Sequence, residues 1–240
     1  MARRPHARKS SPLYLPSAFD LFKPSKDLVL KNIHVFGPLF ILPFIFWGHS
    51  WLDIPANGGH YWNRFTDANY GWSLPTAYWV AFIGFSIIWF LIAVVGGTIV
   101  QIMLQRAQLD AAENREPQLG KLWEVTKKMW KPMVLLFLTM ILIIGIGFIF
   151  LIVPGLILLR RYFFAPYVML ERKCSVREAL DRSAHLSAIN TGSVWGLIGV
   201  MFLIGLLGIV PIIGSLASFV AGSLYSVAPA LRYQQLKKLA

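Results

Sequence analysis

The sequence predicts an all-α integral membrane protein with about six transmembrane helices, and three observations support this fold class. Hydrophobic residues make up 56% of the 240 residues and charged residues only 14%, with a mean hydropathy of +0.59. That composition is more apolar than is usual for a soluble domain. Apolar runs recur at about the length of a bilayer crossing, which is roughly 20 residues. Basic residues gather between these runs, as they do beside transmembrane helices.

The six predicted spans lie at residues 33–52, 77–104, 133–153, 156–170, 192–210 and 212–231. Residues 1–32 are predicted as a basic cytosolic tail and interfacial helix, 33–232 as the membrane domain, and 233–240 as a second basic tail. The fourth run is short, because residues 155–170 rise only about 24 Å at ~1.5 Å each, against a hydrocarbon core of about 30 Å. Local thinning of the bilayer or a polar cavity is therefore expected beside this span.

The orientation follows from where the basic residues fall. If residues 156–170 cross the membrane, 20 lysines and arginines lie on one side and only Arg64 on the other. If they do not cross, the counts become 13 and 10. Positive residues are enriched on the cytosolic side of membrane proteins. The sequence therefore predicts six spans with both termini cytosolic, and its formal charge of +12 is explained without nucleic acid as a partner.

Amphipathic helices are expected on the cytosolic side, between the spans. Apolar residues recur at helical spacing after the second span, with lysines between them, at Leu119, Leu122, Trp123, Thr126 and Trp130. Such a segment is predicted to lie flat on the membrane. After the fourth span, Ser175 and Glu178 have the spacing of a capping box, which predicts a second helix at 176–188. A third is expected at 26–33.

Two sequence features indicate how the spans turn and pack. Helix breaks are expected at Pro154 with Gly155, and at Pro211. Small residues recur at every fourth position of the last span, at Gly214, Ser218, Gly222, Ser226 and Ala230. Such a stripe lets two helix backbones approach closely. Packing within one subunit is the favoured interpretation, and a seam between two copies is the alternative.

The best candidate site in the sequence is Arg160 with Arg161, followed by Tyr162, inside the short fourth span. None of the predicted spans contains an aspartate or glutamate to neutralise these arginines. Charges at membrane depth are costly and often functional, and a guanidinium suits a phosphate group, so these residues are candidates for binding lipid or an anion. The alternative is that both arginines extend to the outer headgroups. Because consecutive helix positions diverge by about 100°, the two side chains are not expected to share one groove.

No enzyme signature is present. Cys174 is the one cysteine, so no intrachain disulfide or thiolate cluster is expected. The five histidines lack the spacing of metal ligands, and no glycine-rich phosphate loop occurs. We therefore expect no catalytic residue, no metal and no cofactor.

The fourth span and the segment after it resemble a known family. The shared positions are Pro154, Gly155, Arg160, Tyr162, Ala165, Pro166, Leu170, Glu171, Ala179, Leu180 and Ser183. Together they resemble the membrane domain associated with bacterial glycerophosphoryl diester phosphodiesterases and its stand-alone multi-pass relatives. The resemblance implies a six-helix protein of the bacterial cytoplasmic membrane. The chemistry of that family belongs to a separate soluble barrel, for which these 240 residues leave no room, so no catalysis is implied here.

These observations favour a non-catalytic bacterial membrane protein with a lipid- or anion-facing groove near Arg160, which organises the membrane or assists a protein partner. Its expected ligands are membrane lipids, anionic phospholipid among them. The alternative is a transporter or channel for a small or lipidic substrate, with broken helices at Pro154 and Pro211 lining the path. A cavity that reaches both Arg160 and the cytosolic side would favour transport. A closed bundle with a lateral groove would favour the first interpretation.

Overall fold

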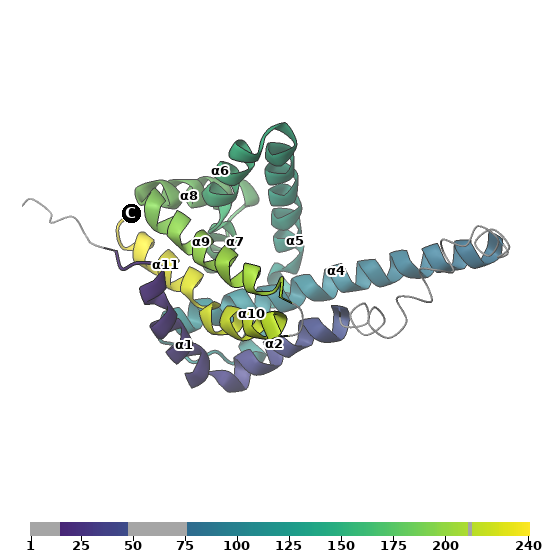
Figure 1. Cartoon of the computed structure of the whole chain (residues 1–240), viewed down its shortest axis with the longest axis horizontal. Coiled ribbons are helices and arrows are strands. Elements are labelled where there is room, and N and C mark those ends of the chain that lie inside the picture. The colour runs from purple at the N-terminus through teal and green to yellow at the C-terminus, as the bar shows by residue number, and fades with distance from the viewer. Residues whose placement is uncertain (1–14, 48–75, 211–212) are drawn as a thin grey trace, which may run out of the picture.

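The computed structural model describes residues 15–47, 76–210 and 213–240, and every element in these parts is a helix (Figure 1). The elements are η1 Phe19–Leu21, α1 Phe22–Lys31, α2 Ile33–Trp47, α4 Thr76–Ala112, α5 Leu119–Phe150, α6 Ile152–Tyr162, α7 Ala165–Arg172, α8 Val176–Ile189, α9 Thr191–Leu207, α10 Ile213–Tyr225 and α11 Ala228–Lys237. The prediction of an all-α protein is confirmed for the described residues.

Within the described residues, three helical segments are long and apolar enough to cross a bilayer: Leu119–Phe150, Ile152–Arg172 and Ile213–Lys237. A fourth is obtained if α8 and α9, which are bent by 101° at Asn190, count as one span. By length and composition, the described residues therefore contain three to four candidate spans, as is typical of a membrane protein. Six spans and cytosolic termini remain predictions, and residues 48–52 of the first predicted span lie outside the described part.

The amphipathic segment before the third predicted span is not a separate helix, which corrects the expectation that it lies flat on the membrane. Helix α5 runs without interruption from Leu119 to Phe150 through Pro132. The physical reason is one continuous buried stripe along the whole helix. Its members follow one another at intervals of three or four residues: Leu122, Thr126, Met129, Met133 and Leu136. The same face packs into the core on both sides of the proline.

The expected break at Pro154 and Gly155 is displaced, and this is a second correction. The chain turns at Leu151, whose backbone is extended, and α6 begins at Ile152. Pro154 lies in the first turn of α6, where a missing N–H costs no helical hydrogen bond. The span at 152–172 is thus longer than the predicted 156–170 and rises about 32 Å at ~1.5 Å per residue, so bilayer thinning is not required. The span is instead interrupted at Phe163 and Phe164, between α6 and α7.

Helices α5 and α6 form a tight hairpin, and two glycines allow it. In Figure 1, α6 folds back beside the upper end of α5. A Cβ added to Gly147 of α5 would lie 3.0 Å from the Cα of Gly155, and one added to Gly155 would lie 2.5–2.8 Å from atoms of the Phe148 ring. Both glycines are buried. The role of Gly155 is therefore close packing of two helices and not a helix break.

The small-residue stripe of the last predicted span is divided between two helices. Helix α10 ends at Tyr225 and α11 begins at Ala228, so Ser226 lies in the turn between them and Ala230 lies in α11. Gly214, Ser218 and Gly222 lie on α10, next to α9 of the same chain: the Ser218 hydroxyl donates to the Ile204 carbonyl at 2.8 Å. This favours packing within one subunit over a seam between two copies. Pro211, the other expected break, lies outside the described residues.

The amino-terminal part of the described chain is fastened to its carboxyl-terminal helices. The Tyr225 hydroxyl donates to the Ala18 carbonyl at 2.8 Å, and Arg232 donates to the Pro16 carbonyl at 2.8 Å. Helix α11 continues to Lys237, and its Tyr233 and Leu236 are buried in the core. Much of the predicted tail at 233–240 is therefore a packed helix.

Candidate functional site

Arg160 and Arg161 lie in the last turn of α6, directly before the interruption of the span. Arg161 is exposed, whereas Arg160 is partly buried and its Nε has no hydrogen-bond partner among the described residues. Tyr162 is half-buried and packs against the core. The three neighbours therefore have different surroundings, as expected from their angular spacing on a helix. Their role in binding lipid or an anion stays a prediction.

The backbone at this interruption is held by two serines of α8. The Ser183 hydroxyl donates to the Arg161 carbonyl at 2.9 Å and accepts from the Phe164 N–H at 3.1 Å. The Ser187 hydroxyl donates to the Arg160 carbonyl at 3.0 Å. A broken helix leaves backbone groups without intrahelical partners, and these are costly when buried. The two serines satisfy them, so α8 stabilises the bent form of the span.

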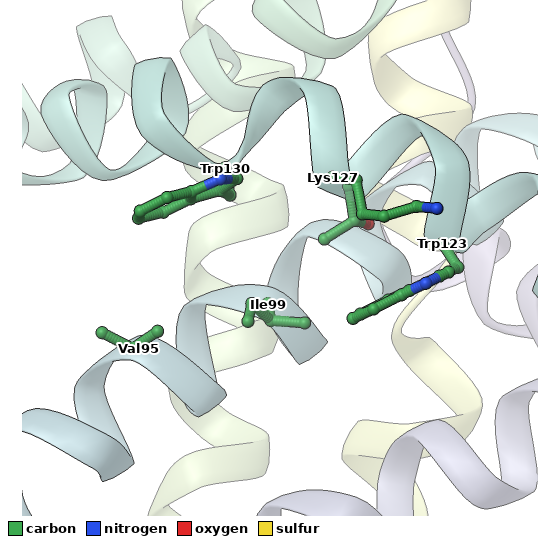
Figure 2. A pocket seen from close by; sticks show the side chains of 6 residues that line it. Val95, Ile99, Trp123, Lys127 and Trp130 are labelled. Carbon is green, nitrogen blue, oxygen red and sulfur yellow. The ribbon is translucent and has the colours of Figure 1, made fainter.

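An apolar cleft of about 220 Å³ lies elsewhere, between α4 and α5 (Figure 2). Its α5 wall carries Trp123, Thr126, Lys127 and Trp130, which share one helix face because they are spaced by three or four residues. Its α4 wall carries Val95 and Ile99, one turn apart, and Figure 2 shows both indole rings on the side of α5 that faces these residues. The Thr126 hydroxyl donates to the Leu122 carbonyl at 2.8 Å, so it offers no free donor to a ligand.

Lysines and exposed apolar side chains surround this cleft. Lys127 pairs with Glu124 at 2.6 Å, and the Lys131 ammonium lies 5.6 Å from the centre of the Trp130 ring. Further along α5, away from these lysines, large apolar side chains are between 53% and 67% exposed: Leu135, Leu138, Ile141 and Leu142. On α4, exposed apolar side chains lead up to the cleft: Ile88, Ile92, Val94 and Val95. The cleft therefore lies where a lysine-rich surface meets an apolar one.

The sequence predicted the side chains of the α5 wall of this cleft but not those of the α4 wall. Trp123 and Trp130 were expected on an amphipathic helix, but nothing in the sequence relates them to Val95 and Ile99. That relation depends on the pairing of α4 with α5 in space. Arg160 is not among the residues that line the cleft.

The described residues offer no alternative site for a metal. Within residues 15–47, 76–210 and 213–240, no three side chains of histidine, cysteine, aspartate or glutamate come together as ligands. The sequence also allows a zinc site at His49, Asp53 and His60, and these residues lie outside those ranges. The chain matches no family model, no curated protein and no solved structure. Function must therefore be inferred from the geometry of this chain.

Proposed function

We propose that this protein is a non-catalytic membrane protein that holds a phospholipid, with one acyl chain in the cleft between α4 and α5. The observation that carries the proposal is the pair of tryptophans, Trp123 and Trp130, above Val95 and Ile99, with Lys127 at the same cleft. Tryptophan prefers the membrane–water interface, where its ring is apolar and its N–H is hydrated. An acyl chain in the cleft buries apolar surface, and the lysines attract an anionic headgroup.

The position of the cleft supports a lipid from the surrounding bilayer as the occupant. The apolar faces of α4 and α5 continue from the cleft on both walls, so an acyl chain can enter sideways without leaving an apolar environment. Lys127, which also pairs with Glu124, and Lys131 would lie at the headgroup side of this lipid. Retention of such a lipid would serve the organisation of the membrane around this protein or around a protein partner.

Photocrosslinking tests this proposal. Purified protein in nanodiscs is irradiated with phosphatidylglycerol that carries a photoreactive group in its acyl chain, and the labelled peptides are mapped by mass spectrometry. We expect labels at 95–99 of α4 and at 123–130 of α5. Ile99→Trp should reduce this labelling severalfold because the added ring fills the cleft.

Ile88→Trp is the matched control, because Ile88 is on the same helix, is 60% exposed and does not line the cleft. It should leave the labelling at 95–99 and 123–130 unchanged. Uniform labelling of all lipid-facing helices, with no difference between the two variants, would contradict a specific lipid site.

The proposed topology has six spans in a bacterial cytoplasmic membrane, with both termini and the turn between α7 and α8 in the cytosol. Cys174 lies in that turn and is the one cysteine of the chain. A membrane-impermeant maleimide should label it in inside-out vesicles but not in intact spheroplasts. Burial, and then the nearby Glu178 carboxylate, raise the pKa of the Cys174 thiol above its ordinary value. Since the thiolate is the reactive form, labelling at neutral pH should be slow and should accelerate as the pH rises.

The control for sidedness is Thr66→Cys in a Cys174→Ser background. Thr66 lies in the predicted outer connection, outside the described residues. This variant should be labelled in intact spheroplasts. Labelling of Cys174 from the outside would exclude the proposed orientation.

A transporter is the second candidate, and the broken helices favour it. The segment Ile152–Arg172 is interrupted at Phe163 and Phe164, and α8 and α9 are bent by 101°. Interrupted helices line the substrate paths of many transporters. Proteoliposomes with a fluorescent phospholipid distinguish the two functions: movement of lipid between leaflets that depends on the protein would favour transport, and its absence would favour a retained lipid.

A further inference from the structure

A second hollow, of about 360 Å³, lies among α7, α8 and α11, and from its lining we infer a binding site for a phosphoryl group. Four of its lining side chains belong to basic residues: Arg172 of α7, Arg182 and His185 of α8, and Lys237 of α11. Tyr233 of α11 also lines it. No acidic side chain is among its lining residues. This inference stands apart from the α4–α5 cleft, with which the hollow shares no residue.

The carboxylates nearby neutralise only part of this charge. Glu178 accepts from Arg182 through both Nε and Nη2, each at 2.9 Å. Glu171 pairs with Lys237 and also accepts from the Tyr233 hydroxyl. Two side-chain carboxylates thus lie beside three positively charged side chains. Ala240, the last residue in the sequence, also lines the hollow, so the excess positive charge is that of the side chains alone.

Arg172 is exposed and has no ion pair of its own among the described residues, although it also interacts electrostatically with the nearby Glu171 carboxylate. In the part of the chain that the structure describes, its guanidinium makes no ion pair, whereas Arg182 and Lys237 each have one. Arg172 is the last residue of α7, and Lys173 follows it with a positive φ of 51°. This left-handed residue ends α7 and starts the turn into α8. The turn keeps Arg172 and the α8 residues Arg182 and His185 around one hollow.

The chemistry of these groups selects a phosphate. A guanidinium donates two parallel hydrogen bonds to phosphate oxygens, and a lysine adds a further charge-assisted donor. Val168 and Leu186 form an apolar part of the wall. The volume is in the range of small-ligand sites, which is about 300–1,000 Å³. The ligand class is a phosphate monoester, either a soluble one or the headgroup of a lipid such as phosphatidic acid.

Titration calorimetry with inorganic phosphate tests the site in the purified full-length protein. Arg172→Gln should weaken phosphate binding about tenfold or more, which corresponds to about 1.4 kcal/mol or more. Arg172→Lys should recover part of the affinity, because lysine restores the positive charge but not the two parallel hydrogen-bond donors of the guanidinium. The matched control is Arg177→Gln, which removes the same charge from an exposed residue of α8 that does not line the hollow.

A second measurement identifies the source of the phosphoryl group. The same variants are compared in nanodiscs that contain phosphatidic acid or phosphatidylcholine, by native mass spectrometry of the lipid retained. Phosphatidic acid retained by the wild type and Arg177→Gln, but not by Arg172→Gln, assigns the site to a headgroup. Binding of inorganic phosphate alone assigns it to a soluble ligand.

Equal effects of Arg172→Gln and Arg177→Gln would overturn the inference, because they would show a general response to charge. Absence of saturable binding of both phosphate and phosphatidic acid to the wild type would also overturn it. Neither outcome changes the expected acyl-chain labelling of the α4–α5 cleft, so the two proposals fail separately.

Discussion

Gly155→Leu should destabilise the protein by about 3 kcal/mol, because the α5–α6 hairpin has no room for a side chain at this position. An added Cβ alone would lie 2.5–2.8 Å from atoms of the Phe148 ring, and Gly155 is buried against Gly147. A larger side chain must separate the two helices or displace Phe148. Fluorescence-detected size-exclusion chromatography after heating should show a lower apparent Tm and a smaller monodisperse fraction.

Gly145→Leu is the matched control, and its expected effect has the opposite sign. A Cβ added to Gly145, on α5 one half-turn before Gly147, meets nothing within 4 Å. Leucine also favours a helix over glycine by nearly 1 kcal/mol. Gly145→Leu should therefore leave the Tm unchanged or raise it. Equal losses in both variants would show that the close crossing of the two helices is not what requires glycine.

The helical class and several helix positions follow from local sequence signals. The capping box at Ser175 predicted a helix at 176–188, and α8 occupies Val176–Ile189 with the Glu178 N–H donating to the Ser175 hydroxyl at 3.3 Å. The continuity of α5 was also present in the sequence, as a stripe from Leu122 to Leu136, but the change from amphipathic to apolar composition suggested two elements. A change of surroundings along a helix does not require a change of backbone.

The break predicted at Pro154 shows that a proline alone does not locate the end of a helix. Pro154 suggested a break, yet a proline in the first turn of a helix is compatible with it. The real interruption at Phe163 and Phe164 directly precedes Pro166, which lies in the first turn of α7 and has no N–H to donate to the Tyr162 carbonyl. Its stability depends on Ser183 and Ser187, which are about twenty residues away in the sequence. No local pattern predicts that contact.

The candidate sites were the least predictable part, because each combines distant segments. The α4–α5 cleft joins residues near 97 to residues near 127, and the basic hollow joins α7, α8 and α11. Arg160 could be identified as a candidate from the sequence, because it lies in an apolar run and no predicted span contains an acidic residue to pair with it. Arg172 was counted only as a basic residue beside a span. That Arg172 has no ion pair of its own depends on how the carboxylates nearby pair with Arg182 and Lys237, which only the fold shows.

Ser183→Ala should cost about 2–3 kcal/mol, because it leaves a buried N–H without a partner and a partly buried carbonyl with a weakened one. Ser183 is fully buried, and its hydroxyl serves the Arg161 carbonyl and the Phe164 N–H together. The Arg161 carbonyl keeps a longer contact of 3.3 Å from Ser187, whereas no other partner of the Phe164 N–H is present in the described part of the chain. Ser187→Ala should cost less, about 1 kcal/mol. It removes the contacts of 3.0 Å and 3.3 Å to the Arg160 and Arg161 carbonyls, but Ser183 still donates to the Arg161 carbonyl.

The double variant Ser183→Ala with Ser187→Ala should cost more than the sum of the two single variants. In each single variant the remaining serine still reaches the Arg161 carbonyl, whereas in the double variant neither does. Residues that share a partner are expected to couple in this way. Thermal unfolding of the four proteins in one detergent measures the coupling, and Ser175→Ala, a loss of about 1 kcal/mol at the exposed cap of the same helix, calibrates the scale. Strict additivity would mean that the two serines do not share the task of stabilising the bent span.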